Sequence, residues 1–188
     1  MDKITKIATL TNPKFVKPIS IEYTQNGEHK LWEAVESHDS VSILLWHKTK
    51  SAFVLVKQLR PPVFHAHPKD AYMYELCAGI VDKELSLKEI AQEEILEECG
   101  YDVPLLNIQR ISSFYTSVGL SGASQTLYYA QVDESMKKTE GGGLVEEQIE
   151  VIYIKTQDAK EFMFDESYPK TPGLMMAFYW WFENRERG

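Results

Sequence analysis

The sequence has few of the features that mark secreted, membrane-bound or nucleic-acid-binding proteins. It contains two cysteines in 188 residues, Cys77 and Cys99, which is too few for a disulfide scaffold. We expect two reduced core thiols in a cytoplasmic protein. No apolar run approaches the roughly 20 residues of a membrane-spanning helix. The opening residues, MDKITKIATL, lack the long apolar stretch of a signal peptide. We therefore expect no membrane partner.

Positive charge is also scarce. Lys and Arg number 20 against 28 Asp and Glu, so the formal net charge is −8 at pH 7. A protein that grips nucleic acid by its phosphates needs a basic surface, so we expect no nucleic-acid partner. A small phosphorylated ligand remains compatible, because one or two arginines and a metal ion can hold it. The sequence shows no internal repeat, and 44% hydrophobic residues are enough for one sizeable core.

Short strand-like runs separated by turns fill the first part of the chain. In IEYTQNGEHKLWEAV, the pair Asn26-Gly27 predicts a hairpin. VSILLWHKTKSAFVLVKQLRP predicts two strands joined by a polar turn, the second of which ends at Pro61-Pro62. VFHAHPKDAY is expected to be a loop, and MYELCAGIV a single buried strand.

One helix stands out at the centre. LSLKEIAQEEILEECG begins with Ser86 and Glu89 in a capping-box pattern and ends at Gly100, which suits a helix C-terminus. NIQRISSFYTS, SQTLYYAQV and QIEVIYIK predict strands, with the mobile polar loop ESMKKTEGGGLVEE before the last. GLMMAFYWWFENRER after Pro172 predicts a terminal helix. This order predicts an α/β (α+β) sandwich rather than a doubly wound parallel sheet.

The central helix combines apolar and acidic side chains on one face. A helical projection places four apolar residues on a core-facing stripe: Leu87, Ile90, Ala91 and Ile95. Glu94 and Glu98 fall in the same arc and Glu97 at its edge, whereas Glu89 and Glu93 point away. Uncompensated burial of two neighbouring carboxylates is costly. A hard cation resolves this conflict, because Mg²⁺ takes carboxylate oxygens and shares its remaining shell with water and phosphate.

The segment from Gly79 to Tyr101 resembles the Nudix box, Gly-x5-Glu-x7-Arg-Glu-U-x-Glu-Glu-x-Gly-U, where U is apolar. The positions that match in register are Gly79, Glu94, Ile95, Glu97, Glu98 and Gly100. The sequence departs from the pattern at three positions. Leu85 stands where the first Glu is expected, with Glu84 beside it, and Tyr101 replaces an aliphatic residue. Glu93 replaces an Arg that, in the family, orients a metal-binding Glu.

The resemblance to Nudix hydrolases implies a fold and a metal site. It implies a mixed β-sheet sandwiched between helices, with an N-terminal antiparallel β-sheet region. Residues 1–38 would form this region and pair two subunits into a homodimer, and 39–188 would form the hydrolase domain. The implied cofactor is Mg²⁺, or Mn²⁺. Its principal ligands would be Glu94 and Glu98, with Glu97 assisting and the carbonyl of Ala78 joining them.

The similarity extends beyond the box. VLVKQLRPP and YELCAGIVD resemble the ADP-ribose and nucleotide-sugar pyrophosphatase branch, in which Arg60 would contact the diphosphate. The alternative is a surface Arg at a strand end. GLSGxxQT is similar to UDP-sugar pyrophosphatases, and it implies substrate contacts from Gly119, Ser121 and Gln125. A tight turn without a ligand is the alternative here.

Further residues take their roles from the same resemblance. It places the catalytic base at Glu147 in GGGLVEEQIEV, with Glu150 in support, Glu146 as a neighbouring candidate and Glu97 assisting catalysis. An ordinary polar loop remains the alternative. Trp32 aligns with an aromatic residue that stacks on the base, in its own site or in the partner's. A core or interface Trp is the other possibility.

Two other features favour structural interpretations. His65 and His67 lie in a presumed loop with no third metal ligand nearby, so we do not assign them to a metal site. Trp180, Trp181 and Phe182 in the terminal helix are expected to be core or dimer contacts.

The expected activity is metal-dependent hydrolysis of the diphosphate of a UDP-sugar, such as UDP-glucose to UMP and glucose 1-phosphate. Within the enzyme class, the alternative is an ADP-ribose or ADP-sugar pyrophosphatase. The departures at Leu85 and Glu93 motivate a second alternative, a nucleotide-binding module that has lost catalysis. A structural protein with an acidic helix is the third.

Overall fold

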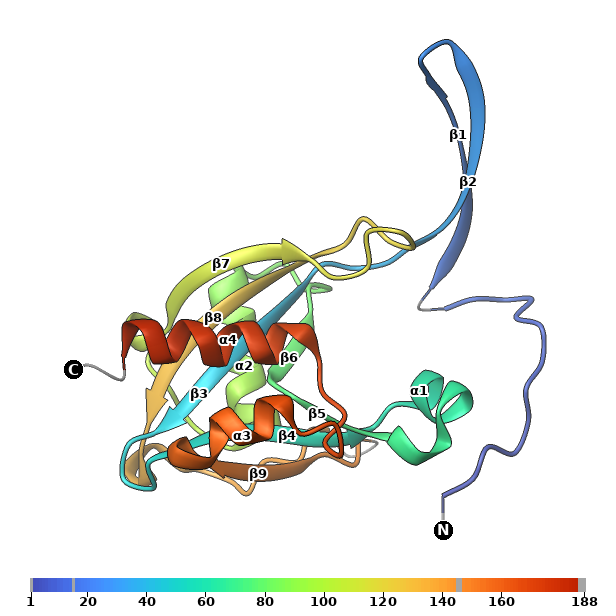
Figure 1. Cartoon of the computed structure of the whole chain (residues 1–188). Coiled ribbons are helices and arrows are strands. Elements are labelled where there is room, and N and C mark those ends of the chain that lie inside the picture. Colours follow the sequence, from blue (N-terminus) through green and yellow to red (C-terminus); the bar gives the residue numbers. More distant parts are fainter. Residues whose placement is uncertain (1, 15, 145–146, 186–188) are drawn as a thin grey trace.

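The computed structural model describes residues 2–14, 16–144 and 147–185. Within these residues, the chain forms a seven-stranded mixed sheet covered by helices and a separate two-stranded antiparallel sheet (Figure 1). This confirms the predicted α/β (α+β) sandwich with an N-terminal antiparallel region. In the described part of the chain, no helix is long and apolar enough to cross a membrane.

The elements follow one another in a simple order. The strands are β1 Lys17–Gln25, β2 Glu28–Glu36, β3 Ser40–His47, β4 Ala52–Leu59, β5 Tyr72–Glu75, β6 Cys77–Ile80, β7 Gln109–Tyr115, β8 Ser124–Val132 and β9 Glu150–Lys155. The α-helices are α1 Pro61–Ala66, α2 Leu87–Cys99, α3 Ala159–Phe164 and α4 Pro172–Asn184.

The hairpin of β1 and β2 projects away from the body of the molecule (Figure 1). Asn26 and Gly27 form its turn with φ of 56° and 82°, the left-handed conformation that a two-residue hairpin turn requires. The predicted Asn-Gly hairpin is therefore confirmed. The pairing places Ile21 opposite Trp32, so these two apolar side chains share one face of the ribbon.

Two short strands, β5 and β6, form a wedge between the diverging parts of β3 and β4 in the large sheet. The first half of β3 pairs with β6, whereas its last three residues pair with β4. The strands β5 and β6 fill the gap where β3 and β4 diverge, since β5 pairs with the far end of β4. The prediction of one strand over MYELCAGIV was therefore wrong. The segment is divided at Leu76 because its two halves take different partners.

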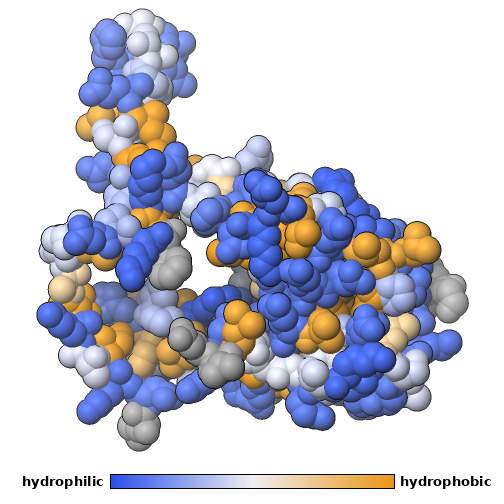
Figure 2. Space-filling model, turned by 180° about the vertical axis from the view of Figure 1, so that it is seen from behind, coloured by the Kyte–Doolittle hydropathy of each residue, from blue (hydrophilic) through white to orange (hydrophobic). Residues whose placement is uncertain are grey.

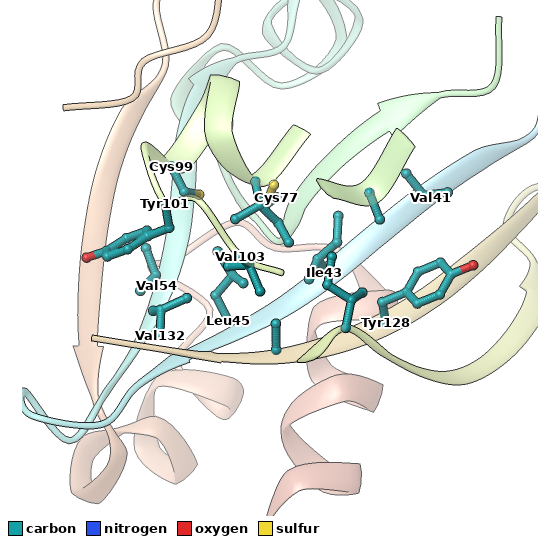
Figure 3. Close-up of a cluster of buried hydrophobic side chains, with 14 of the residues drawn as sticks. Val41, Ile43, Leu45, Val54, Cys77, Cys99, Tyr101, Val103, Tyr128 and Val132 are labelled. Atoms are coloured by element: carbon teal, nitrogen blue, oxygen red, sulfur yellow. The ribbon is translucent and has the colours of Figure 1, made fainter. Parts of the chain in front are cut away.

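Two cores lie on the two faces of the sheet. Val41, Ile43 and Leu45 of β3 point toward α2, in the core that Figure 3 shows. Alternation turns Leu44 to the opposite face, where α3 and α4 pack. There Phe178 stacks on Phe53 with ring centroids 4.2 Å apart. The core-facing residues of α4 also include Trp181 and Phe182, which confirms their predicted core role.

The two cysteines lie in the α2 core. Cys77 on β6 and Cys99 at the end of α2 are both buried and free, as the low cysteine content predicted. Burial raises the pKa of the Cys77 thiol well above its usual range, with a further contribution from a hydrogen bond to Cys99. Both thiols therefore act as small apolar groups in the packing under α2.

Both ends of α2 match the sequence prediction. Ser86 accepts a hydrogen bond from the backbone N–H of Glu89, whose side chain accepts from the N–H of Ser86 in return. At the other end, Gly100 has φ of 77°. One prediction for this helix was wrong, because Leu87 is exposed rather than core-facing. The first turn extends beyond the sheet, and Cys99 provides the fourth apolar contact of the stripe.

Other segments were also assigned wrongly. The expected loop at VFHAHPKDAY contains α1, with Pro residues in its first turn and no buried side chain. The helix α3 was not anticipated, because six residues are too few to establish a helical period, although Ala159, Phe162 and Met163 show the i, i+3, i+4 pattern. The described part of ESMKKTEGGGLVEE is not free of contacts, since its glycines pack against the end of α2.

The end of α2 provides a test of the packing. A Cβ at Gly100 would lie 2.1 Å from the carbonyl oxygen of Thr139, and the residue has positive φ. We expect Gly100→Ala to lower the free energy of unfolding by at least about 2 kcal/mol, measured by urea denaturation. Gly122→Ala is the control, because no heavy atom lies within 4 Å of its added carbon. Equal stability of the two variants would contradict this account.

Candidate active site

The acidic side chains of α2 lie against the backbone of β6. Glu98 is only 5% exposed, and the N–H of Ala78 donates to its carboxylate at 2.9 Å. One residue further along, a Cβ at Gly79 would lie 2.0 Å from Oε1 of Glu94. Only glycine at this position leaves room for the Glu94 carboxylate. The predicted core-facing arc of Glu94 and Glu98 is thus confirmed, with β6 as the surface that they meet.

Burial makes this pair of carboxyls difficult to ionise. Desolvation raises the pKa of Glu98 to about 8, against the stabilising N–H of Ala78, and the charge of Glu94 adds to the increase. Desolvation also raises the pKa of Glu94 to about 7, with Glu97 as the next contribution. Two partly buried carboxyls that repel each other need added positive charge to ionise together at neutral pH.

A lysine side chain supplies positive charge near this pair. The ammonium of Lys83 pairs with Glu93 at 2.6 Å, which accounts for the exposed acidic residue where the box has Arg. The positive charge of Lys83 lowers the pKa of Glu94, against the larger effects of burial and of Glu97. The sequence interpretation missed this residue. The signal was a Lys in the loop that precedes an acid-rich helix, ten positions before Glu93.

The glycine-rich segment brings a further carboxylate toward the site. The N–H groups of Gly142 and Gly143 donate to the carbonyls of Glu98 and Glu97, at 2.9 and 3.1 Å. The carboxylate of Glu147 accepts from the N–H of Leu144 at 2.8 Å. The negative charge of Glu147 contributes to the raised pKa of both Glu94 and Glu98.

The other two acidic candidates of this segment differ from Glu147. Glu150 begins β9 and lies 3.6 Å from the ammonium of Lys57. Glu146 lies outside the described residues.

Arg60, the arginine predicted to contact the diphosphate, is held by an acidic partner. Its guanidinium donates to both carboxylate oxygens of Glu75, at 2.7 and 2.6 Å, in a two-pronged pair. This pair is the main cause of the raised pKa of Arg60, and the charges of Glu98 and Glu147 contribute further. The sequence interpretation missed Glu75, which fixes the orientation of Arg60.

The remaining predicted substrate residues fall into two groups. At the base of the hairpin, the indole N–H of Trp32 donates to the carbonyl of Gly119 at 3.0 Å, and the hydroxyl of Ser121 lies 2.8 Å from that of Ser37. Gln125 lies apart from this group. Its amide donates to Ser40 at 3.2 Å, and its side chain lines a cavity on the α4 side of the sheet.

Comparison with known proteins places this geometry in a family. No protein-family model matches the chain. The chain is 35% identical to uridine diphosphate glucose pyrophosphatase NUDT14 of Bos taurus, over 89% of this chain and 88% of that protein. It is 35% identical to the Mus musculus protein of the same name, over 97% and 96%. This chain belongs to the Nudix hydrolase family. The similarity continues to a GDP-mannose pyrophosphatase of Pectobacterium atrosepticum, at 32% identity over 71% and 67%.

The donor set of this Nudix protein fits a hard divalent cation that keeps part of its shell for other ligands. Among the described residues, no three His, Cys, Asp or Glu side chains converge on a single metal position. Two carboxylates converge instead, Glu94 and Glu98, next to the backbone of Ala78. Mg²⁺ is commonly bound by one or two carboxylates together with water and substrate phosphate. A bound cation would lower the raised pKa of both carboxyls.

The buried carboxyls predict a pH dependence of stability without divalent cation. Both groups bind protons more tightly in the folded chain, so the stability that they contribute is complete below their ordinary pKa of 4.5. It is lost as pH rises toward about 8. Each unit of raised pKa corresponds to about 1.4 kcal/mol. We expect the free energy of unfolding to fall over this range, measured by urea denaturation in EDTA.

Two variants control this measurement. Glu98→Gln keeps a neutral acceptor for the N–H of Ala78, so its stability should fall less steeply with pH. Glu84→Gln removes an exposed carboxylate of the same segment and should keep the wild-type slope. If wild type and Glu98→Gln show the same slope, the burial cost assigned to Glu98 is wrong.

Proposed function

We propose that this Nudix hydrolase cleaves the diphosphate of a UDP-sugar, with UDP-glucose giving UMP and glucose 1-phosphate. The observation that carries the reaction class is the buried carboxylate pair Glu94 and Glu98, held against β6. The substrate class follows from the relatives named as UDP-glucose pyrophosphatases, which match nearly the whole chain. A nucleotide sugar is a small ligand, so an acidic protein can bind its diphosphate without a basic surface.

The cofactor in this proposal is Mg²⁺, with Mn²⁺ as an alternative. Glu94, Glu98 and the carbonyl of Ala78 would hold it, with Glu97 assisting from the edge of the helix. When bound, such an ion neutralises phosphate charge and lowers the pKa of water. Lys83 supplies positive charge near Glu94 despite the Arg-to-Glu departure at Glu93.

The chain's own residues perform the remaining tasks. Arg60, held by Glu75, faces the charges of Glu98 and Glu147 and would bind the diphosphate oxygens. Glu147 would accept the proton of the attacking water as the new P–O bond forms and the bond to the bridging oxygen breaks. We favour Glu147 over Glu150, because Glu147 is electrostatically coupled to both buried carboxyls whereas Glu150 lies beside Lys57.

A substrate panel tests the reaction and its specificity. With Mg²⁺, we expect UMP release from UDP-glucose at a kcat/KM at least about tenfold above AMP release from ADP-ribose, followed by chromatography. GDP-mannose belongs in the panel because a relative is named for it. A clear preference for ADP-ribose would mean that the GLSGxxQT interpretation is wrong.

Matched carboxylate variants identify the machinery in this panel. Glu98→Gln should lose most of the metal-dependent turnover, and Glu147→Gln should lower kcat about 100-fold or more with little change in KM. Glu150→Gln should have a smaller effect, because its carboxylate lies beside Lys57. Nucleotide-sugar binding with no turnover by wild type would favour the non-catalytic alternative.

We further propose that residues 1–38 form the dimerising region and residues 39–188 the hydrolase domain of a cytoplasmic homodimer. The projecting hairpin carries Ile21, Tyr23 and Trp32 on one face, each more than a third exposed. Figure 2 shows apolar side chains along this hairpin. Two strands alone are marginally stable in water, so pairing with a second copy would stabilise them. The free Cys77 and Cys99 support a reducing compartment.

Charge substitution on the hairpin tests the dimer. Ile21→Glu places a charge opposite Trp32 on the apolar face, and we expect it to shift the protein from dimer to monomer in light scattering at micromolar concentration. Ser20→Glu adds the same charge on the opposite face and should leave the dimer intact. A wild-type protein that is already monomeric at these concentrations would refute the assignment.

A further inference from the structure

The carboxylate site occupies the α2 side of β6, but a cavity lies on the opposite side. It has a volume of about 390 Å³ and opens between the edge of the sheet and the N-terminus of α4. Its lining includes Ser42, Ala78, Phe114, Thr116, Gln125 and Gly173. Of these, the sequence indicated Gln125 as a substrate contact and Ala78 as a metal-site residue, but not the others.

The hydroxyl of Ser42 indicates that this cavity receives a ligand. Strand alternation turns Val41 and Ile43 into the α2 core, so the Ser42 side chain faces α4. Ser42 is 2% exposed, and its hydroxyl has no hydrogen-bond partner among the residues that the structure describes. Buried hydroxyls in proteins are nearly always paired, because an unpaired one destabilises the fold. A ligand hydroxyl in the cavity would supply the missing partner.

The helix α4 provides a second wall that suits a polar ligand. It is 13 residues long, and Thr171, Pro172 and Gly173 at its start belong to the cavity lining. The wall has no side chain at Gly173. A Cβ there would lie 3.2 Å from Oε1 of Gln125 and 3.5 Å from the ring of Phe114. Glycine at this position therefore lets the start of α4 approach a polar amide and an aromatic ring closely.

The chemistry of the lining favours a neutral sugar over a phosphate. No Lys or Arg is among the described residues that line the cavity, whereas Glu75 contributes a carboxylate. Hydroxyls from Ser42 and Thr116, the amide of Gln125 and the ring of Phe114 are the groups that recognise sugar hydroxyls and sugar faces. The lining has no Lys or Arg of its own to bind an anionic group, and the Glu75 carboxylate is already paired with Arg60. A base edge pairs with the same polar side chains, so a comparison of UDP-glucose with UDP separates a bound sugar from a bound base.

The position of the cavity connects it to the carboxylate site. Ala78 lines the cavity, and its N–H also donates to Glu98. A sugar in the cavity would therefore lie across the Ala78 backbone from the Glu98 carboxylate. We propose that this cavity binds the hexosyl group of the nucleotide sugar, with Ser42, Gln125 and the Gly173 surface as its specificity determinants. The inference rests on the proposed hydrolysis of a nucleotide sugar.

Selectivity between two substrates tests the proposal. We compare kcat/KM for UDP-glucose with that for the methyl ester of UDP, which has the same nucleotide and diphosphate but no hexosyl group. Ser42→Ala and Gly173→Ala should each lower the ratio about three- to tenfold, as expected for the loss of one hydrogen bond or of fitted volume. Ser42→Ala should not lower Tm, because it removes an unpaired hydroxyl. Gly173→Ala should change Tm only slightly, because the gain in helix propensity offsets the small shift that its Cβ requires of the Gln125 amide.

Thr126→Val is the matched control for these variants. It also removes a buried hydroxyl from the sheet, but that hydroxyl is paired with Ser113 at 2.8 Å and does not line the cavity. It should lower Tm and leave the selectivity ratio unchanged. If the Ser42 and Gly173 variants keep the wild-type ratio, or if losses in ratio follow losses in Tm, the proposal is overturned.

A binding measurement separates this inference from the proposed function. In ¹⁵N-labelled Glu98→Gln protein, the amide signals of Thr116 and Gly173 should move on addition of UDP-glucose but not of UDP. Equal movement with both ligands would overturn the sugar assignment. Absence of UMP release by wild type would instead refute the hydrolase proposal, while the amide shifts still decide whether the cavity binds the sugar.

Discussion

The burial of the Glu98 carboxyl against β6 is the constraint on which the rest of the site depends. Hydrogen bonds from the backbone N–H of Ala78 and from the Cys77 thiol partly offset its desolvation. Glu94 adds a second partly buried carboxyl one turn away, so that the two oppose each other's ionisation. Without a cation, this arrangement lowers the stability of the fold and has no structural benefit. The unfavourable electrostatics are therefore the physical argument for a metal-dependent role.

The carboxyls keep their positions because both ends of α2 are fixed. The capping box at Ser86 sets where the helix begins, and left-handed Gly100 ends it where Thr139 and the glycine-rich segment pack closely. The N–H groups of Gly142 and Gly143 then satisfy carbonyls in the last turn. The same backbone contacts bring Glu147 toward the carboxyl pair. The contacts that end α2 therefore also position the proposed base.

Local signals in the sequence were sufficient to predict α2 and the hairpin. Features that depend on pairing between distant segments could not be predicted. Ser86, Gly100 and the Asn26-Gly27 turn each act within a few residues, so pattern and propensity are sufficient for them. The division at Leu76 depends on the divergence of β3 and β4, which the segment itself does not encode. The convergence of Glu94 and Glu98 on the core side was predicted from one helix. The cavity was not, because Ser42 meets α4 only after folding brings together segments that are about 130 positions apart.

The wedge strand β6 explains how one short segment can serve two functions. Its backbone at Ala78 and Gly79 receives the carboxyls of α2 on one side, and Ala78 borders the cavity on the other. Because neighbouring strands supply the rest of each side, the walls can vary independently. Side chains of β3, β7 and β8 and the start of α4 shape the cavity, while α2 supplies the two carboxyls on the other side. Changes in sugar preference can therefore accumulate on the α4 side without moving Glu94 or Glu98. Relatives named for glucose and mannose nucleotides are consistent with such a division.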